Sequence, residues 1–596
     1  MTDYRPPLDD MRFVIREIAD LPGVLTLPGW EELDLDTVDA VLEEAGRFGA
    51  EVLGPLNVAG DKGCVFENGV VRTPDGFADA WQQFVDSGWN SLAFEGEVGG
   101  QGLPCVLSTA VSEIWCGANM AFSLCPMLTE AAGELLAHHG DENLRSQYLP
   151  KLVSGEWTGT MLLTEPQAGS DLGRVRTRAR PDGDHWRLSG QKIFITFGEH
   201  DMAPNIIHLV LARTPNAPEG VKGISLFLVP KFLPGDDGQP GARNDVRCVS
   251  IEHKLGIRGS PTAVLALGDN DGAIGYMVGS ENRGLDLMFT MMNHARMAVG
   301  LEGVGIADRA YQEARAYALE RVQGRDLGSR DPAAVAIAHH PDVQRMLLSM
   351  KAVSEGARAL AYFTAAAVDR SQRHPDPDVR ARQQRLVGLL TPVVKAWCTD
   401  VGILVADQAI QVHGGTGYIE ESGVPQFLRD ARIASIYEGT NGIQAMDLVG
   451  RKVAGDGGAA AQELIADIEA FAGAAAEPDE HADAAVIRQR LAVAVAELAE
   501  ATRWLVHTYP SDPRRAAAGA VFYLRLLGDV AAGWLMAKAA RHSAGNGSGL
   551  APAFVEAKRL VARCFADTRL VEAAAMHAQL VGIGESLARI DVDKHL

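Results

Sequence analysis

The stretch QVHGGTGYIEESGVPQFLRDARIASIYEGTNGIQ, residues 411–444, combines a glycine-rich turn, an amphipathic segment and an acid. Its glycines follow the apolar run VGILVADQAIQV, so the plainest interpretation is a helix that glycine ends in the left-handed conformation. One glycine is enough to end a helix. The three glycines Gly414, Gly415 and Gly417 suggest in addition that the backbone approaches something closely, such as a phosphate or a flat ring.

An acid follows in the same stretch, where Tyr437, Glu438 and Gly439 place a carboxylate between an aromatic ring and a glycine. An apolar pocket beside a ring disfavours the charged form of a glutamate, which raises its pKa and makes it usable as a general base. The alternative is a surface glutamate at the end of a helix. The stretch alone leaves both interpretations open.

Composition excludes several classes of function. The 596 residues are enough for two to four domains, and 47% of them are hydrophobic, which supports well-filled cores. The formal charge of -22 argues against a nucleic-acid partner, because phosphate backbones are bound by clustered lysine and arginine. Seven cysteines without a CxxC pair, and no HExxH sequence, argue against a disulfide framework and a zinc site. We expect no metal.

The sequence also predicts where the protein resides. The longest charge-free window in the first third, residues 114–129, contains Pro126 and is too short to span a membrane. The start, MTDYRPPLDDMRF, lacks the basic and then apolar layout of a signal peptide. We therefore expect a cytoplasmic protein without a membrane span.

The periodicity of the apolar residues predicts an α+β fold that is mostly helical. Residues 1–160 show helical spacing, and residues 161–275 contain the short β-type runs IIHLVLAR, GISLFLVP, VRCVSIEH and AVLALG between turn clusters. No helical pattern alternates with these runs, which argues against a nucleotide-binding parallel sheet. Residues 276–453 return to long helices, and an alanine-rich region at residues 460–596 predicts three or four more.

Two helical stretches show the apolar face that packing requires. The first face combines Leu301, Val304, Ala307, Ala310 and Ala314. In the C-terminal region the corresponding positions are Leu491, Val495, Leu498 and Leu505, followed by Leu524, Leu527, Ala531 and Leu535.

Four motifs together resemble the acyl-CoA dehydrogenase family in order and spacing. They are LTEPQAGSD at 163–171, KIFIT at 192–196, QVHGGTGY at 411–418 and IYEGTNGIQ at 436–444. The resemblance covers roughly residues 75–453, and the C-terminal part is similar to the extra helical domain of the longer members. It implies an N-terminal helical domain, a central β domain, a helical bundle, FAD as cofactor and an acyl-CoA as substrate.

The resemblance also implies the residues of the FAD site. The flavin ring would lie against Thr164, Gly169, Ser170, Phe194, Ile195 and Thr196, with Thr196 hydrogen-bonding the reactive nitrogen. The remaining FAD candidates are Arg321, Gln323, Gln411, Gly414, Gly415, Thr440 and Asn441. Arg321 would reach the FAD pyrophosphate of a neighbouring subunit, although RVQGR at 321–325 departs from the commoner family form RKTFG. If it does so, the protein works as an oligomer, and we expect a homodimer.

Acyl-CoA candidates follow from the same resemblance. They are Ser170, Asn293, Arg296, Tyr437 and Gly439, with Asn293 and Arg296 near the coenzyme A adenosine. An arginine on a helix is more often part of a solvated face or an ion pair, and Tyr437 would equally serve as a packing residue. Glu165 in LTEP is the other candidate acid.

The reaction that the resemblance implies is α,β-dehydrogenation in fatty-acid β-oxidation or related acyl-CoA breakdown. Glu438 would remove the α proton while a hydride leaves the β carbon for the flavin. The enolate oxygen would accept hydrogen bonds from the Glu438 amide and a flavin ribityl hydroxyl. The expected electron acceptor is an electron-transferring flavoprotein. The alternatives are an acyl-CoA oxidase and a non-catalytic flavin-binding relative, and the acyl chain length stays open.

Overall fold

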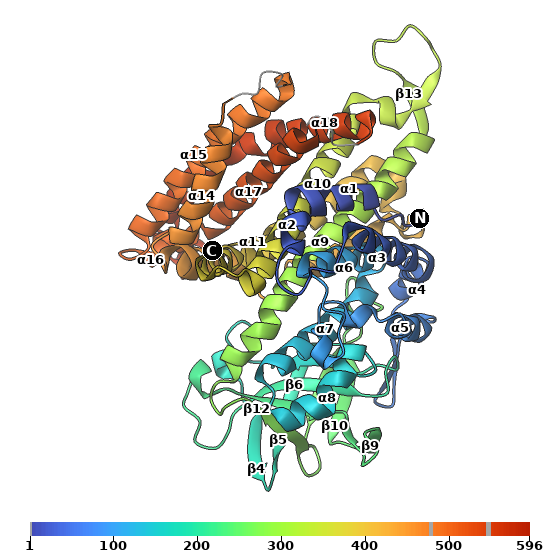
Figure 1. Cartoon of the computed structure of the whole chain (residues 1–596), viewed down its shortest axis with the longest axis vertical. Coiled ribbons are helices and arrows are strands. Elements are labelled where there is room, and N and C mark those ends of the chain that lie inside the picture. Colours follow the sequence, from blue (N-terminus) through green and yellow to red (C-terminus); the bar gives the residue numbers. More distant parts are fainter. Residues whose placement is uncertain (1–2, 476–480, 544–549) are drawn as a thin grey trace. The chain divides into compact units, whose positions relative to one another are not determined.

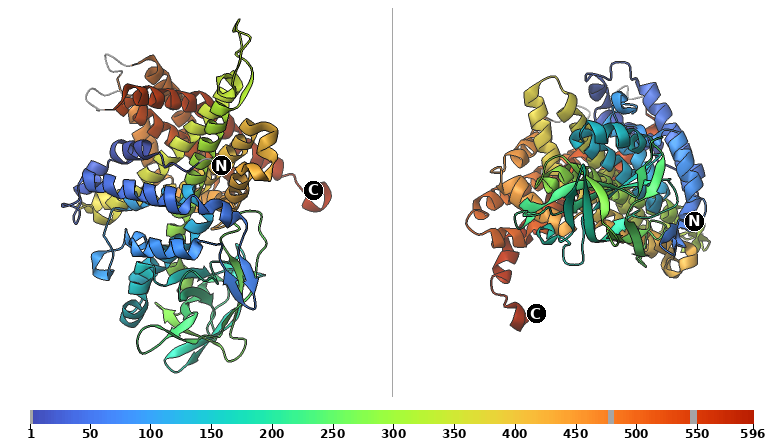
Figure 2. Two further views of the ribbon diagram at one scale, coloured as in Figure 1. Left: turned by 90° about the vertical axis from the view of Figure 1, so that its right-hand side faces the viewer. Right: turned by 90° about the horizontal axis from the view of Figure 1, so that it is seen from below.

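A computed structural model describes residues 3–475, 481–543 and 550–596. The chain forms two compact units (Figures 1 and 2). One, here called the sheet unit, comprises residues 47–103 and 118–298. The other, the helical unit, comprises residues up to 46, 104–117 and 299–596. Helices α3 (Leu35–Phe48), α6 (Cys105–Ala118) and α9 (Gly284–Glu320) pass from one unit to the other.

The sheet unit is built on an eight-stranded sheet in the order β10-β11-β5-β12-β7-β6-β3, with β4 paired to β5. Strands β3 and β6 pair in parallel, and the other pairs are antiparallel. The strands are β3 (Thr158–Leu162), β4 (Arg178–Asp182), β5 (His185–Thr196), β6 (Ile206–Ala212), β7 (Ser225–Pro230), β10 (Val246–Ile251), β11 (Thr262–Leu267) and β12 (Ala273–Val278). The four runs expected to be strands are therefore β6, β7, β10 and β11.

Both faces of this sheet are covered, because alternate residues of one strand point to opposite faces. Along β6, Leu209 joins a core cluster that includes Leu128, while Val210 joins a different cluster that includes Ile195. The first cluster lies under α7 (Met120–His139) and α8 (Glu142–Ser154), which Figure 1 shows beside the sheet. A strand buried on both faces reads as a continuous apolar run, as IIHLVLA does.

Smaller elements complete the sheet unit. They are α4 (Leu56–Asp61), α5 (Phe77–Asp86), the hairpin β1 (Val65–Glu67) with β2 (Val70–Arg72), and the hairpin β8 (Phe232–Pro234) with β9 (Pro240–Arg243). The hairpin β1–β2 lies within the region that the sequence predicted to be helical.

The helical unit contains most of the long helices. The α-helices that lie wholly within this unit, short ones included, are α1 (Leu8–Phe13), α2 (Leu21–Leu25), α10 (Pro341–Arg373), α11 (Pro377–His413), α12 (Val424–Ala434), α13 (Asn441–Asp447), α14 (Ala459–Ala472), α15 (Ala482–Thr508), α16 (Pro513–Ala518), α17 (Ala520–Ser543), α18 (Pro552–Thr568), α19 (Ala573–Leu587) and α20 (Val592–His595). A hairpin of β13 (Val322–Arg325) and β14 (Ala334–Ala336) extends beyond the ends of α9 and α10 (Figure 1).

The expected apolar faces of α9, α15 and α17 are buried at every position predicted. Two glycines explain how closely α9 and α17 approach α11. A Cβ at Gly303 would lie 2.2 Å from the Cys398 carbonyl oxygen, and one at Gly528 would lie 2.6 Å from the Trp397 ring. The C-terminal region holds five described helices of 14 residues or more, so the expectation of three or four was too low. The expected loop SAGNGSGLAP lies largely outside the described residues.

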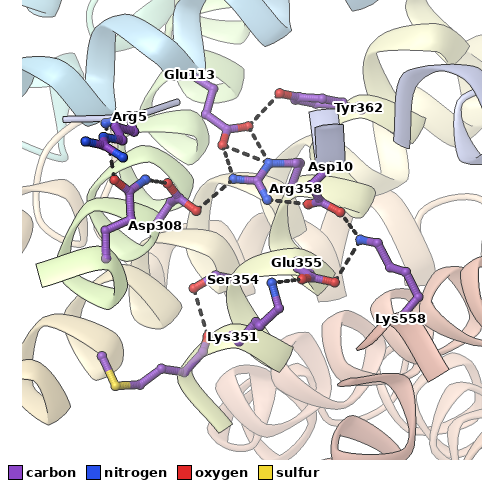
Figure 3. Close-up of polar contacts among 12 residues, drawn as sticks. Arg5, Asp10, Glu113, Asp308, Lys351, Ser354, Glu355, Arg358, Tyr362 and Lys558 are labelled. Atoms are coloured by element: carbon purple, nitrogen blue, oxygen red, sulfur yellow. Dashed lines mark hydrogen bonds and ion pairs between the residues drawn. The ribbon is translucent and has the colours of Figure 1, made fainter. Parts of the chain in front are cut away.

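Buried ions connect the first helix to the bundle and to the C-terminal helices (Figure 3). Arg358 donates from Nε and Nη2 to Glu113, and from Nη1 to Asp10 at 2.5 Å. Lys558 on α18 contacts Asp10 and, at 2.8 Å, Glu355. Because a buried charge without a partner is strongly unfavourable, these pairs couple α1, α6, α10 and α18.

By length and composition alone, α11 and α17 could each cross a membrane. In both helices, 83% of the apolar window is buried inside the protein. Burial of this kind is what a core helix shows, so the two helices are weak evidence for a membrane protein.

Candidate active site

Glu438 lies on a tight turn between α12 and α13 and is half-buried. Its φ of 55° is left-handed, a conformation that residues other than glycine adopt at a cost of about 1 to 3 kcal/mol. The following Gly439 has a φ of 83°, which glycine adopts easily. The backbone therefore reverses at Glu438 itself, and the surrounding structure must hold it in place.

Hydrogen bonds from α11 and α13 supply that constraint. Gln444 Nε2 donates to the Glu438 carbonyl oxygen at 3.0 Å, and Lys395 Nζ donates to the Gly439 carbonyl oxygen at 2.8 Å. Lys395 also donates to Asn441 Oδ1 at 2.9 Å. The Asn441 amide donates in turn to α11, and Thr440 caps α13 through its hydroxyl. The predicted FAD candidates Thr440 and Asn441 thus have a structural role in this turn.

Tyr437 connects the same turn to α9. Its hydroxyl donates to Oε2 of Glu302, which is only 1% exposed. The hydroxyl is therefore used inside the helical unit, as suits the packing role considered from sequence. Its predicted contact with substrate stays a prediction.

In the sheet unit, the LTEP and KIFIT motifs lie side by side. The Ile193 amide donates to the Thr164 carbonyl oxygen at 3.0 Å, although the two residues are distant in sequence. Glu165, which is 4% exposed, accepts hydrogen bonds from Lys192 Nζ at 2.9 Å and from the Thr177 hydroxyl at 2.6 Å. Burial opposes the charge on Glu165, yet Lys192 and Thr177 outweigh burial and lower its pKa to about 2. Glu165 is thus a structural anion that joins the two motifs, and a poor base.

Phe194 and Thr196 stand at the end of β5 next to an irregularity in its pairing with β11. Phe194 has a left-handed φ of 59°, and its side chain is 58% exposed. Ile195 is buried in the core, whereas Thr196 is half-buried. An exposed ring in a strained backbone, beside a hydroxyl, is a surface that a flat polar ring system fits.

The glycines among the FAD candidates leave the backbone open. Apart from the neighbouring residues in the chain and the backbone of the same turn, no described residue has an atom within 4 Å of the place where a Cβ would stand at Gly169, Gly414 or Gly415. Ser170 beside Gly169 is exposed, so its hydroxyl is accessible to solvent. An open, glycine-lined backbone permits the close approach that phosphates and ring edges need. These residues fit FAD.

The remaining FAD candidates gather at one end of the helical unit. The Tyr317 ring near the end of α9 stacks on His413 at the end of α11, with ring centroids 4.2 Å apart. This contact brings the Arg321 turn close to the glycine-rich turn η8 (Gly414–Tyr418). Arg321, Gln323 and Gln411 are all exposed. Their FAD contacts, including any across a subunit boundary, stay predictions.

Asn293 and Arg296, the predicted coenzyme A contacts, lie one turn apart on α9 in the sheet unit. Arg296 Nη1 donates to Asn293 Oδ1 at 3.4 Å, and the guanidinium lies over the Phe289 ring at 5.9 Å. Arg296 is 7% exposed, whereas Asn293 is exposed. Of this pair, Asn293 is therefore the residue that solvent reaches.

Sequence reasoning missed three residues around the Glu438 turn, namely Glu302, Lys395 and Gln444. A signal for two of them was present. Glu302 interrupts the apolar face of α9 between Leu301 and Val304, and Lys395 interrupts the apolar run TPVVKAWC. Charged residues inside a buried helix face are rare unless they have partners. Among the described residues, no cluster of three or more possible metal ligands occurs.

Comparison with known protein families gives matches along most of the chain. Four domain models of the acyl-CoA dehydrogenase family match it: the N-terminal domain at residues 37–156, the middle domain at 160–269, the C-terminal domain at 282–454, and an acetyl-CoA dehydrogenase C-terminal-like domain at 464–591. The fourth match corresponds to the extra helices of the C-terminal region.

Individual relatives agree. A 3-methylmercaptopropionyl-CoA dehydrogenase of Ruegeria pomeroyi is 49% identical over 98% of this chain and 99% of its own length. A broad-specificity linear acyl-CoA dehydrogenase of Mycobacterium tuberculosis is 33% identical over 96% of each chain. An acyl-CoA dehydrogenase of Bacillus anthracis complexed with FAD shares the fold at a TM-score of 0.76, with 21% identity over 98% of this chain and 92% of that one. The protein therefore belongs to the acyl-CoA dehydrogenase family, as an FAD-dependent oxidoreductase with an additional C-terminal helical domain.

Proposed function

We propose that the protein removes one hydrogen from each of the α and β carbons of an acyl-CoA thioester, with Glu438 as the catalytic base and the trans-2-enoyl-CoA as product. The observation that carries this proposal is the turn at Glu438. Hydrogen bonds from α11 and α13 hold the backbone carbonyl groups of the left-handed Glu438 and of Gly439, so the fold specifies where the Glu438 side chain leaves the backbone. A general base needs such positioning, because proton transfer requires contact with the reacting atom.

The chemistry of the base follows from its surroundings. The bond between the α carbon and its proton breaks, and the proton passes to the Glu438 carboxylate. The thioester oxygen gains negative charge in this step, and the Glu438 backbone amide is the donor proposed to stabilise it, an effect of about 3 to 4 kcal/mol at known oxyanion sites. When bound, FAD accepts the hydride that leaves the β carbon. Thr164, Phe194 and Thr196 are the residues proposed to hold the flavin ring.

For the substrate we propose a short acyl-CoA that carries a thioether, 3-methylmercaptopropionyl-CoA being the first to test. The support is the similarity to the Ruegeria enzyme of that name over nearly the full length of both chains. The Mycobacterium relative, named for linear acyl-CoAs, favours straight-chain substrates as the second candidate and fatty-acid β-oxidation as the pathway.

For the electron acceptor we propose an electron-transferring flavoprotein, with the enzyme acting in the cytoplasm. The alternatives are an acyl-CoA oxidase, which passes electrons to oxygen and forms peroxide, and a flavin-binding relative without dehydrogenase activity. The presence of a constrained Glu438 argues against the last.

A homodimer is the assembly that suits the surface of the helical unit. Leu327, on the loop of the β13–β14 hairpin, is 80% exposed, and Tyr418, at the end of the glycine-rich turn, is 85% exposed. Exposed apolar side chains beside the predicted FAD contacts Arg321 and Gly414 favour burial against a second copy of the chain.

The experiment mixes the purified holoenzyme anaerobically with 3-methylmercaptopropionyl-CoA and straight-chain acyl-CoAs of increasing length, and follows the visible flavin absorbance. Bleaching that persists until an artificial acceptor is added supports the dehydrogenase. Rapid recovery in air with formation of peroxide supports the oxidase instead. If none of these substrates bleaches the flavin, the proposed substrates are wrong.

A further inference from the structure

Glu302 is an acid in a helix face that is otherwise apolar. It lies on α9 beside Leu301 and Val304, and like them it is buried, at 1% exposure. Burial raises the pKa of Glu302 to about 8, against the effects of the Tyr437 hydrogen bond and the Lys395 charge. Burial thus favours the neutral form of Glu302, as expected for an acid in a site without water.

Among the described residues, this acid accepts a hydrogen bond only from the hydroxyl of Tyr437. Its second oxygen, Oε1, is buried without a partner in that same part of the chain. Tyr437 immediately precedes Glu438, and its amide donates to the Ile433 carbonyl oxygen at 3.2 Å. Tyr437 is thus fixed at both ends, by α12 through its backbone and by Glu302 through its side chain. This bond is the link from α9 to the strained turn.

The charged and titratable groups that face this pair come from three elements besides α9. Lys395 on α11 and Glu438 on the turn both act on Glu302, the first lowering and the second raising its pKa. Cys116 on α6 faces Tyr437. Because the negative charges of Glu302 and Glu438 repel each other, a proton on one of the two carboxyl groups makes ionisation of the other easier.

We propose that Glu302 is a positioning residue for the catalytic base, holding the Glu438 turn through the hydroxyl of Tyr437. Its buried Oε1, which has no partner among the described residues, suits the protonated form of the acid. The inference rests on the proposed role of Glu438. A neutral Glu302 avoids placing a second negative charge beside the base. When Glu302 ionises, repulsion makes Glu438 a stronger proton acceptor.

The first test measures the protonation of Glu302 without any turnover. Melting temperatures of the holoenzyme and of Glu302→Gln are compared at pH 5 and pH 8. An unfolded glutamate ionises near pH 4.3, whereas buried Glu302 holds its proton up to about pH 8. Between about pH 4.3 and about pH 8 the folded wild type therefore binds one more proton than the unfolded chain, and Glu302 makes it less stable as pH rises. Glu302→Gln stays neutral, so its melting temperature should rise relative to that of wild type between pH 5 and pH 8.

Glu463→Gln, at an exposed ion pair with Arg385, is the matched control for the loss of one surface carboxylate. The quantity compared is the difference in melting temperature between Glu302→Gln and wild type. If this difference is the same at pH 5 and pH 8, or changes only as much as in the control, Glu302 is not protonated in the folded protein over this range. This result is independent of whether Glu438 is the base.

The second test measures the rate of anaerobic flavin bleaching at saturating acyl-CoA. Glu302→Leu and Tyr437→Phe both break the link, and each is expected to slow bleaching by roughly tenfold to a hundredfold at neutral pH. Glu302→Gln keeps an acceptor for the tyrosine and is expected to recover most of the rate that Glu302→Leu loses. In wild type the rate should rise a few-fold as pH passes about 8, and this rise should be absent in Glu302→Gln.

The outcomes separate the two proposals. If Glu438→Gln bleaches as fast as wild type, the base assignment fails, whatever the Glu302 variants do. If Glu438→Gln is inactive but Glu302→Gln keeps the alkaline rise, or Tyr437→Phe bleaches at the wild-type rate, the positioning role of Glu302 is overturned. Flavin content and melting temperature of each variant show whether it is folded. If Glu302→Leu does not fold, the bleaching rate of Tyr437→Phe alone tests the positioning role.

Discussion

Replacing Arg358 with methionine should destabilise the helical unit strongly. The guanidinium is 1% exposed and contacts Asp10 at 2.5 Å, Glu113 at 2.5 Å and Asp308 at 3.3 Å. Methionine fills similar space but leaves Glu113 without the cation that it pairs with, in a site that water does not reach, whereas Asp10 keeps its contact with Lys558. Removing one partner of a buried ion pair typically costs about 3 to 5 kcal/mol. For a cooperative unit of several hundred residues, this corresponds to a fall in melting temperature of roughly 5 °C.

The assay is thermal unfolding followed by circular dichroism, with Arg382→Met as the matched control. Arg382 pairs with Asp467 at 2.7 Å, but both side chains are about half exposed, so its loss should cost under about 1 kcal/mol. Adding Glu113→Gln to Arg358→Met should restore part of the stability, because one buried charge is then removed. A single variant no less stable than the control, or a double variant with purely additive losses, would refute the reasoning.

Three further predictions concern separate parts of the chain. Lys395→Met removes the donor to the Gly439 carbonyl and should slow flavin bleaching at least tenfold while FAD stays bound. Stopped-flow absorbance measures this rate, and an unchanged rate would contradict the constraint on the turn. The sheet unit should lose stability as pH falls from about 4.3 towards 2, because Glu165 becomes protonated and loses its ion pair with Lys192. Acid-unfolding curves of Glu165→Gln should show a smaller loss over this range. Parallel curves for wild type and Glu165→Gln would contradict an ionised Glu165 paired with Lys192. Leu327→Asp should weaken the proposed homodimer in light scattering, and an equally stable dimer would place the interface elsewhere.

The fold could be predicted from the sequence wherever one helix or strand carries its own signal. The period of the apolar residues predicted the buried faces of α9, α15 and α17, and β-branched runs predicted β6, β7, β10 and β11. Strand β5 was not predicted as a strand, because HWRLSGQKIFIT mixes polar and apolar residues without clear alternation. Its pairing with β11 and β12, on either side, depends on residues far away in sequence.

The candidate site shows the same division. Glu438 stands out in the sequence because Tyr437 and Gly439 flank it. The partners that hold it, Lys395 and Glu302, come from helices 43 and 136 residues earlier, and no local pattern joins them to the turn. Glu165 was the other candidate acid because its ion pair with Lys192, which makes it a poor base, forms only when the sheet folds and leaves no local sequence pattern. Sequence motifs therefore locate candidate groups, whereas tertiary contacts decide which of them stay available for chemistry.

The central claim is that Glu438 is the base that starts dehydrogenation. The most direct measurement is the single-turnover rate of flavin bleaching for wild type and Glu438→Gln, each loaded with FAD and mixed anaerobically with saturating acyl-CoA. The amide has nearly the same shape but accepts a proton poorly, so the rate should fall on the order of a hundredfold to ten-thousandfold while FAD stays bound. A variant that keeps more than about a tenth of the wild-type rate would contradict the account.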